Sequence, residues 1–192
     1  AILGHAGGDG SAAVIGANAV TAPIFQVVSV LFTSSANASG VIIGKTVGED
    51  DVPRVKIYTR RLQLIYVATG LICCVSLLLL KNILVGFYDI TSETADLAKQ
   101  FLTVLSITIV GSAYEMPALG GIVSAGGDTK FVLKNDIIFM WCMVLPLSYL
   151  SAFVFGWAPA VTFFILKSDQ ITKCIVALVK VNRYKWIKKL TR

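Results

Sequence analysis

The stretch GSAAVIGANAVTAPIFQVVSVLFTSSANASGVIIG, residues 10–44, contains 35 residues without a charged side chain. About 20 helical residues cross a bilayer core of about 30 Å, so this stretch is long enough to span it. Further apolar stretches follow, and the last, residues 137–166, holds GWAP at residues 156–159. Because Gly and Pro mark turns and helix starts, we divide it there. The sequence thus predicts five membrane-spanning helices, at about residues 12–44, 62–80, 97–123, 131–155 and 159–179.

The composition is that of a membrane protein. Hydrophobic residues make up 56% of the chain and charged residues 15%, against about 25% charged residues in soluble domains. The 17 basic and 11 acidic side chains are too few to cover a water-facing surface. We therefore expect an all-α fold, a polytopic bundle of membrane-spanning helices with the lipid bilayer as its first partner. The polar stretches Lys45–Arg61 and Lys81–Asp96 are expected to be connectors.

The distribution of positive charge predicts the orientation of the bundle. Five spans place alternate connections on opposite sides, with 13 of the 17 basic residues on one side and two on the other; Lys167 and Lys173 lie in the last helix. Since cytoplasmic loops carry the excess of Lys and Arg, the C-terminus is expected in the cytoplasm, with residues 180–192 as a basic tail. Its sequence NRYKWIKKLTR, residues 182–192, mixes aromatic and basic residues. This favours a helix at the level of the lipid headgroups over contact with nucleic acid.

An acidic residue inside a predicted span is the foremost functional candidate. Glu115 lies about 20 Å along the third helix, and Pro117 follows it, which predicts a bend at the carboxylate. A charge in a span needs a partner, a wet cavity or a function. Glu115 is accordingly predicted to couple an ion or proton, or else to be a structural acid bonded to another helix. Its neighbour Tyr114 is a candidate for the wall of a substrate cavity.

Two further sets of polar residues lie within the spans. Asp169 and Lys173 stand four residues apart on one face of the fifth helix, as an internal ion pair or as the lining of a substrate route. In the first helix, Gln26, Ser29, Thr33 and Asn37 form a polar stripe, with Asn18 further back and Pro23 between. Hydrogen bonds between helices and the wall of a water-filled cavity both explain the stripe. Asn18, Gln26, Asn37, Asp169 and Lys173 therefore join Tyr114 as cavity candidates.

The sequence lacks the parts of an enzyme. Its four cysteines lie in apolar stretches without a CxxC spacing, and it has one histidine. The glycines of GGDTK, residues 126–130, do not form the GxxxxGK[ST] pattern of a phosphate-binding loop. There is no Ser, His and Asp set and no dinucleotide fingerprint. We expect no enzymatic activity, no bound metal and no cofactor.

Three segments carry a family resemblance. They are IVSAGGDTKFVLKNDIIFMWCMVLPLSYLSAFVFG (residues 122–156), LKSDQITKCIVALVKVNRYKWIKKLT (residues 166–191) and GKTVGEDD (residues 44–51). In this order they resemble the C-terminal half of a multidrug and toxic compound extrusion (MATE) transporter of the type common in bacteria. The resemblance covers nearly the whole chain and implies twelve helices in two six-helix lobes, of which the five spans are helices eight to twelve. The missing N-terminal lobe and the first helix of this lobe are then partners of the chain.

The resemblance also implies a mechanism. Members of the family exchange inward movement of H⁺ or Na⁺ for outward movement of a small amphipathic, often cationic drug, by alternating access. An acid on the fourth helix of the lobe commonly takes part in coupling, and Glu115 lies on the matching helix. The implied place is the bacterial plasma membrane. Two alternatives stay open: a lipid-linked oligosaccharide flippase of the same superfamily, whose basic cavity only Lys167 and Lys173 offer, and a structural membrane subunit.

Overall fold

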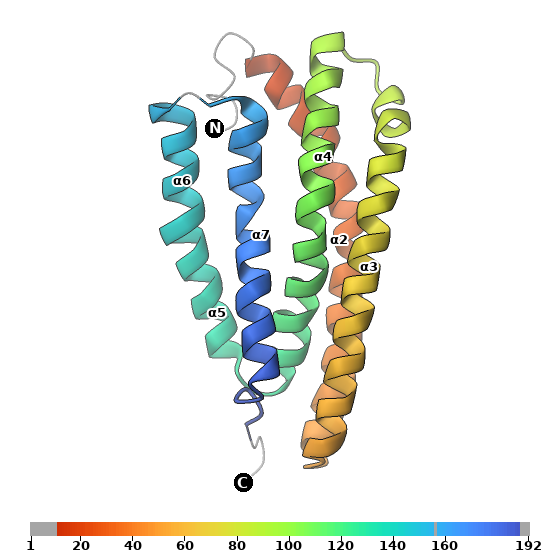
Figure 1. Ribbon diagram of the computed structural model, residues 1–192, viewed down its shortest axis with the longest axis vertical. Helices are drawn as coiled ribbons and strands as arrows, with labels where there is room; N and C mark the ends of the chain where they lie inside the picture. Colours follow the sequence, from red (N-terminus) through yellow and green to blue (C-terminus); the bar gives the residue numbers. More distant parts are fainter. Residues whose placement is uncertain (1–10, 156, 189–192) are drawn as a thin grey trace.

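The computed structural model describes residues 11–155 and 157–188, and within them it contains helices and no strand (Figure 1). Five long helical stretches run up and down beside one another. They are α2 (Ser11–Gly48), α3 (Val52–Gly86), α4 (Ser92–Glu115) continued by the π-helix η2 (Met116–Val123), the composite helix α5 (Thr129–Ile138), η3 (Phe139–Val144), α6 (Leu145–Tyr149) and η4 (Leu150–Val154), and α7 (Pro159–Asn182).

Four of these stretches are long and apolar enough to cross a membrane: Ser11–Gly48, Val52–Gly86, Ser92–Val123 and Thr129–Val154. The fifth, α7, has the length but carries Lys167, Asp169 and Lys173 near its middle. The outer surface is apolar, since Leu64 and Leu79 are each 73% exposed. A surface of this kind is stable in lipid. The all-α polytopic membrane bundle predicted from the sequence is confirmed.

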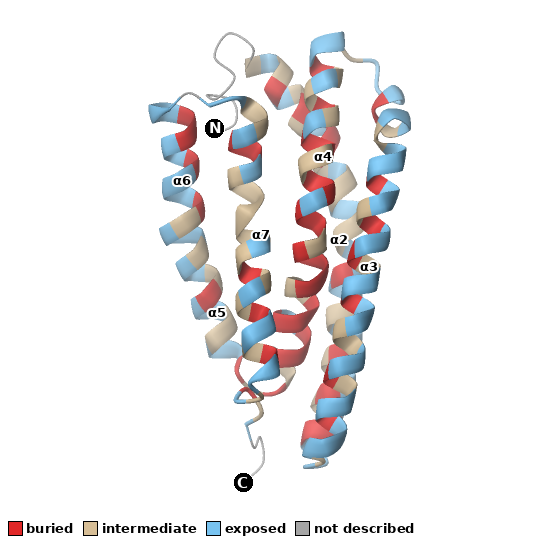
Figure 2. Cartoon of the chain, in the orientation of Figure 1, coloured by how far each residue is buried: buried red, intermediate tan, exposed pale blue. Residues whose placement is uncertain are grey.

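The continuous helix α4–η2 forms the centre of the bundle. It packs against α2, α3 and α7, and 67% of its most apolar stretch is buried, against 22% in each of the other three candidate spans. Figure 2 shows the resulting concentration of buried residues along α4. A charged group within the buried part of α4–η2 is therefore surrounded mainly by protein, whereas Glu93 and Asp96 in the first turns of α4 are exposed.

The helices are longer than predicted. Residues 45–61 and 81–96, expected to be connectors, are mostly helical, and only short turns near Asp51 and Thr91 separate the elements. The Asp51 side chain accepts a hydrogen bond of 3.0 Å from the backbone N–H of Arg54 and so caps α3. The prediction was wrong here because charge ends an apolar run without ending a helix: Lys and Arg are good helix formers in water.

The predicted bend beside Glu115 corresponds to a change of helix type. The α-helical pattern ends at Glu115 and the π-helix begins at Met116. Pro117 has no N–H to donate, and its ring crowds the carbonyl of Ala113, which favours a wider turn. Pro23, by contrast, lies inside α2 without interrupting it.

The described part of the C-terminal tail does not form the expected surface helix. Residues 183–188 turn back under the bundle, and Trp186 is fully buried against Gly126. Its Nε1 donates a hydrogen bond of 2.9 Å to the carbonyl oxygen of Val181. Gly126 lacks a side chain, so the indole fills the space and buries its apolar area in protein. Residues 189–192 of the predicted tail lie outside the described residues.

Asp128 fixes this end of the bundle. It accepts hydrogen bonds from Lys188 at 2.6 Å and Lys180 at 2.7 Å. The hydrogen bonds from Lys180 and then Lys188 hold the pKa of the Asp128 carboxyl below its ordinary value. The loop of residues 126–128 is thereby tied to α7 and to the turn that follows it.

Candidate functional site

A buried cluster of charges joins α4, α5 and α7. Its centre is Lys173 of α7, which is 8% exposed. The Lys173 Nζ lies 3.0 Å from a carboxylate oxygen of Asp136 on α5 and 3.4 Å from one of Asp169, one turn earlier on α7. The predicted ion pair of Asp169 and Lys173 is confirmed, and Asp136 makes it a triad.

Glu115 is the fourth member of the cluster. It lies half-buried at the last residue of α4, and the charges of Lys173, Asp136 and Asp169 act on it. Among the residues that the structure describes, no basic group lies within 4.0 Å of its carboxylate. Glu115 is therefore the acid of the cluster whose charge is not directly paired.

A close approach of two helices brings Glu115 to Lys173. A Cβ atom on Gly111 would stand 2.7 Å from the backbone oxygen of Gln170, so only glycine allows α4 and α7 to come this close. Both helices run in the same direction (Figure 1). One turn further on, α4 presents Glu115 and α7 presents Lys173. The packing of the two backbones thus brings the candidate side chains Glu115 and Lys173 to the same level of the bundle.

Tyr114 faces a different neighbour from Glu115. Its hydroxyl donates a hydrogen bond of 2.8 Å to Oε1 of Gln63 on α3, and Asn182 at the end of α7 lies 3.5 Å from the same amide. The Tyr114 ring also meets Tyr66 edge-on, with 6.3 Å between the centroids. Tyr114 therefore belongs to a polar chain between α3, α4 and α7 and not to the charged cluster.

The polar residues predicted on the first helix lie elsewhere. Asn18 and Gln26 line a cavity of about 110 Å³ together with Lys167, whose Nζ is 4.1 Å from the centroid of the Phe25 ring. Asn37 is exposed on α2.

Within the described residues, the hydrogen bonds of the stripe stay on α2 and do not reach a neighbouring helix. Ser29 and Thr33 donate to backbone carbonyls of α2 itself, at 2.8 and 2.9 Å. Gln26, Thr33 and Asn37 are exposed, and Gln26 borders the cavity with Lys167. Lipid tails offer no hydrogen-bonding partner to polar side chains in the middle of a span, so protein or water must supply one.

Sequence reasoning missed Asp136. The signal was present, because Asp136 lies inside the predicted span 131–155 and is acidic, the two properties that singled out Glu115. Asp136 lies near the end of that span, and nothing in its local sequence points to Lys173. Half of its side chain is exposed, and the other half reaches Lys173.

The chain is similar to a known protein family and to a curated protein. The sequence model of the MatE family matches residues 2–150. The chain is also similar to a curated protein of Bacillus subtilis (strain 168) named "Uncharacterized transporter YisQ", with 23% identity over 184 residues. That match covers 92% of this chain and 40% of the relative, so the chain spans less than half of the relative's length. No solved structure matches the chain.

Proposed function

Because this chain belongs to the MatE family, we propose that it forms the ion-coupling part of a secondary active transporter that exports small molecules in exchange for H⁺ or Na⁺. The observation that carries the proposal is the cluster in which Asp136 and Asp169 share Lys173 while the third acid, Glu115, has no ion-pair partner among the described residues. Glu115 is the acid that binds the coupling ion, and Lys173, Asp136 and Asp169 set the local charge around it.

Charge balance gives the cluster its affinity for a cation. With all four groups ionised, three carboxylates and one ammonium carry a net charge of −2. Leaving unpaired charge in a buried site costs several kcal/mol, of order 3–5. Binding one proton or one Na⁺ at Glu115 reduces the excess to −1, so the ion stabilises the cluster.

Coupling requires that ion binding favour one conformation of the bundle. A ligand shifts an equilibrium only by the difference in its affinity for the two states. Glu115 lies where α4 changes into η2, and π-helical segments inside helices are frequent at functional sites. A change of charge at Glu115 is placed to alter how η2 packs against α2 and α7. The drug and the ion then compete because they favour different conformations of the bundle.

The proposed substrate is a small amphipathic or cationic molecule. The exposed polar side chains of α2, among them Gln26 and Asn37, supply hydrogen-bonding groups that a substrate could reach. Tyr114, Asn18, Asp169 and Lys173 stay as candidates for contact with the substrate during transport. The missing N-terminal lobe and the missing first helix of this lobe are proposed to close the substrate cavity.

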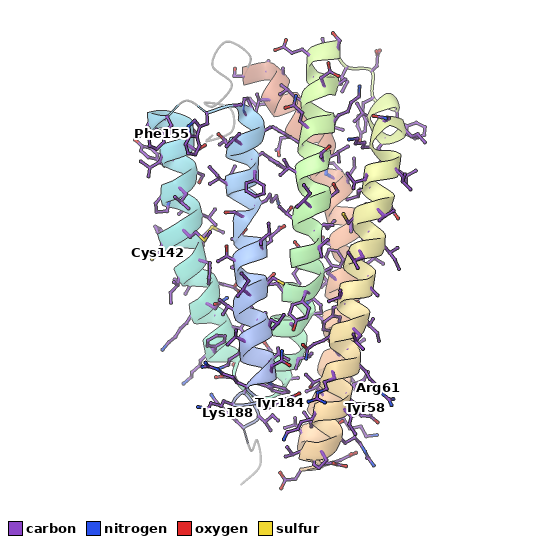
Figure 3. The ribbon with its side chains drawn as sticks, viewed as in Figure 1. Tyr58, Arg61, Cys142, Phe155, Tyr184 and Lys188 are labelled. Carbon is purple, nitrogen blue, oxygen red and sulfur yellow. The ribbon has the colours of Figure 1, made fainter. Side chains whose placement is uncertain are left out.

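The orientation and location are part of the same proposal. The basic residues Arg61 and Lys188 lie at one end of the bundle and Phe155 at the other (Figure 3). By the excess of positive charge on cytoplasmic loops, we place the basic end in the cytoplasm of a bacterial plasma membrane.

The side-chain contacts favour the antiporter over the flippase. A flippase for a polyanionic lipid needs free positive charge in its cavity. Lys173 is engaged by Asp136 and Asp169, and the ammonium of Lys167 lies over an aromatic ring. A structural subunit would have no use for an unpaired acid at the centre of the bundle.

The test is Glu115→Gln in the full-length protein, with Glu93→Gln as the matched control on the same helix. Glu93 lies exposed in the first turn of α4. We expect Glu115→Gln to abolish drug resistance of cells while the protein remains inserted in the membrane, and Glu93→Gln to retain resistance. Wild-type resistance from Glu115→Gln would refute the coupling role.

A further inference from the structure

A groove of about 390 Å³ lies between α5 and α7 at the basic end of the bundle. Ile175, Val176 and Val179 of α7 and Phe131 of α5 form its apolar walls. Basic residues line its end, namely Lys180, Arg183 and Lys185. The volume lies within the range of about 300–1,000 Å³ that is typical of ligand sites.

The basic end of the groove holds one fixed charge and two free ones. Lys180 is held by Asp128 at 2.7 Å and lies 3.9 Å from the centroid of the Phe131 ring. Arg183 and Lys185 are exposed, and no acidic group within residues 11–155 and 157–188 lies within 4.0 Å of either. The groove therefore ends in two positively charged side chains that have no acidic partner among the described residues.

A turn of the chain brings these two cations together. If α7 continued, Arg183 and Lys185 would point about 200° apart around the helix axis. Instead α7 ends at Asn182, and Tyr184 takes a left-handed conformation with φ of 52°. Such a conformation is uncommon for a residue other than glycine. It reverses the chain so that both side chains line the same groove.

We propose that this groove is a binding site for an anionic phospholipid. Arg183 and Lys185 hold the headgroup phosphate, and one acyl chain lies along Ile175 and Val179 against Phe131. Ile175 is 63% exposed and Val179 44% exposed, so both already face the lipid phase. Basic pockets between membrane helices select anionic headgroups through charge. The long basic side chains reach the headgroup level from the end of the helix.

The experiment titrates the purified protein in detergent with phosphatidylglycerol and with phosphatidylcholine of the same acyl chains, and counts bound lipid by native mass spectrometry. Phosphatidylglycerol is expected to bind more tightly. The variant Arg183→Gln with Lys185→Gln is expected to raise the Kd for phosphatidylglycerol about 25-fold, or about fivefold for each cation.

Two further variants separate the groove from a general attraction to positive charge. Arg60→Gln with Arg61→Gln removes two exposed charges of α3 that lie outside the groove, and is expected to change the Kd less than twofold. Val179→Trp fills the groove without changing its charge and is expected to weaken binding as well. Equal binding of the two lipids, equal loss in the Arg60 and Arg61 variant, or full binding by Val179→Trp would overturn the proposal. None of these readouts depends on transport.

Discussion

Replacing Lys173 by methionine tests the charged cluster as a structural unit. The substitution keeps an unbranched apolar stem up to the ε position and removes the ammonium that Asp136 and Asp169 share. Unit charges 3.4 Å apart, as in the pair with Asp169, interact by about 5 kcal/mol at an effective dielectric constant of about 20. In the intact protein, most of this attraction offsets the dehydration of Lys173. In the variant, both acids lose their partner, and Asp169, whose side chain is 17% exposed, remains largely buried.

We expect Lys173→Met to lower the free energy of unfolding by about 3–5 kcal/mol, the usual effect of breaking a buried pair. For a chain of this size, that corresponds to a fall in Tm of about 6–20 °C. Thermal unfolding of the purified protein in detergent, followed by fluorescence, measures it.

Two companion variants separate pairing from packing. Asp136→Asn is expected to cost less than about 1 kcal/mol, since the side chain of Asp136 is 50% exposed and its pair is screened by water. Adding Asp169→Asn to Lys173→Met removes an uncompensated buried charge and is expected to restore part of the lost Tm. A Tm for Lys173→Met within 2 °C of the wild type, or no recovery in the double variant, would refute the reasoning.

Two further predictions concern the packing of α4 and the end of the bundle. Gly111→Ala is expected to destabilise the protein by about 1–3 kcal/mol, because its Cβ would meet the Gln170 backbone oxygen at 2.7 Å. Gly48→Ala serves as the control, since nothing lies within 4 Å of the added atom. Equal Tm values for the two variants would contradict the close approach of α4 and α7. Asp128 has a lowered pKa in the folded protein, so the stability it contributes is present above its ordinary pKa of about 3.9 and is lost as the pH falls through its lower folded-state pKa. The free energy of unfolding, measured between pH 6 and pH 2, is expected to fall at the acid end, and to fall less in Asp128→Asn. An equal fall in that variant would count against stabilisation by the ion pairs of Asp128 with Lys180 and Lys188.

The main outline of the fold could be predicted because lipid imposes simple rules on sequence. Long apolar stretches bounded by charge, with the Gly and Pro of GWAP dividing the last one, give the number of helices. The pair of Asp169 and Lys173 follows from a spacing of four on one helix. The ends of the helices could not be read in this way. A charge at residue 45 or 54 marks where the apolar stretch ends, whereas α2 continues to Gly48 and α3 already begins at Val52, after its N-cap Asp51.

The composition of the cluster depends on contacts between helices that are far apart in the sequence. Asp136 of α5 meets Lys173 because the composite helix that begins with α5 packs against α7 through η3, α6 and η4. Nothing in the local pattern around either residue specifies that contact. Trp186 likewise resembled an interfacial aromatic residue, and its burial depends on the space that Gly126 leaves on a separate loop.

The central claim is that Glu115 converts an ion gradient into movement of the substrate. The most direct measurement uses the full-length protein reconstituted in vesicles, with a proton or Na⁺ gradient imposed and the export of a fluorescent cationic drug recorded. We predict that the wild type and Glu93→Gln accumulate drug against its gradient. Glu115→Gln is predicted to bind the drug yet show no accumulation when the ion gradient is applied. Gradient-driven accumulation by Glu115→Gln at the wild-type rate would contradict the claim.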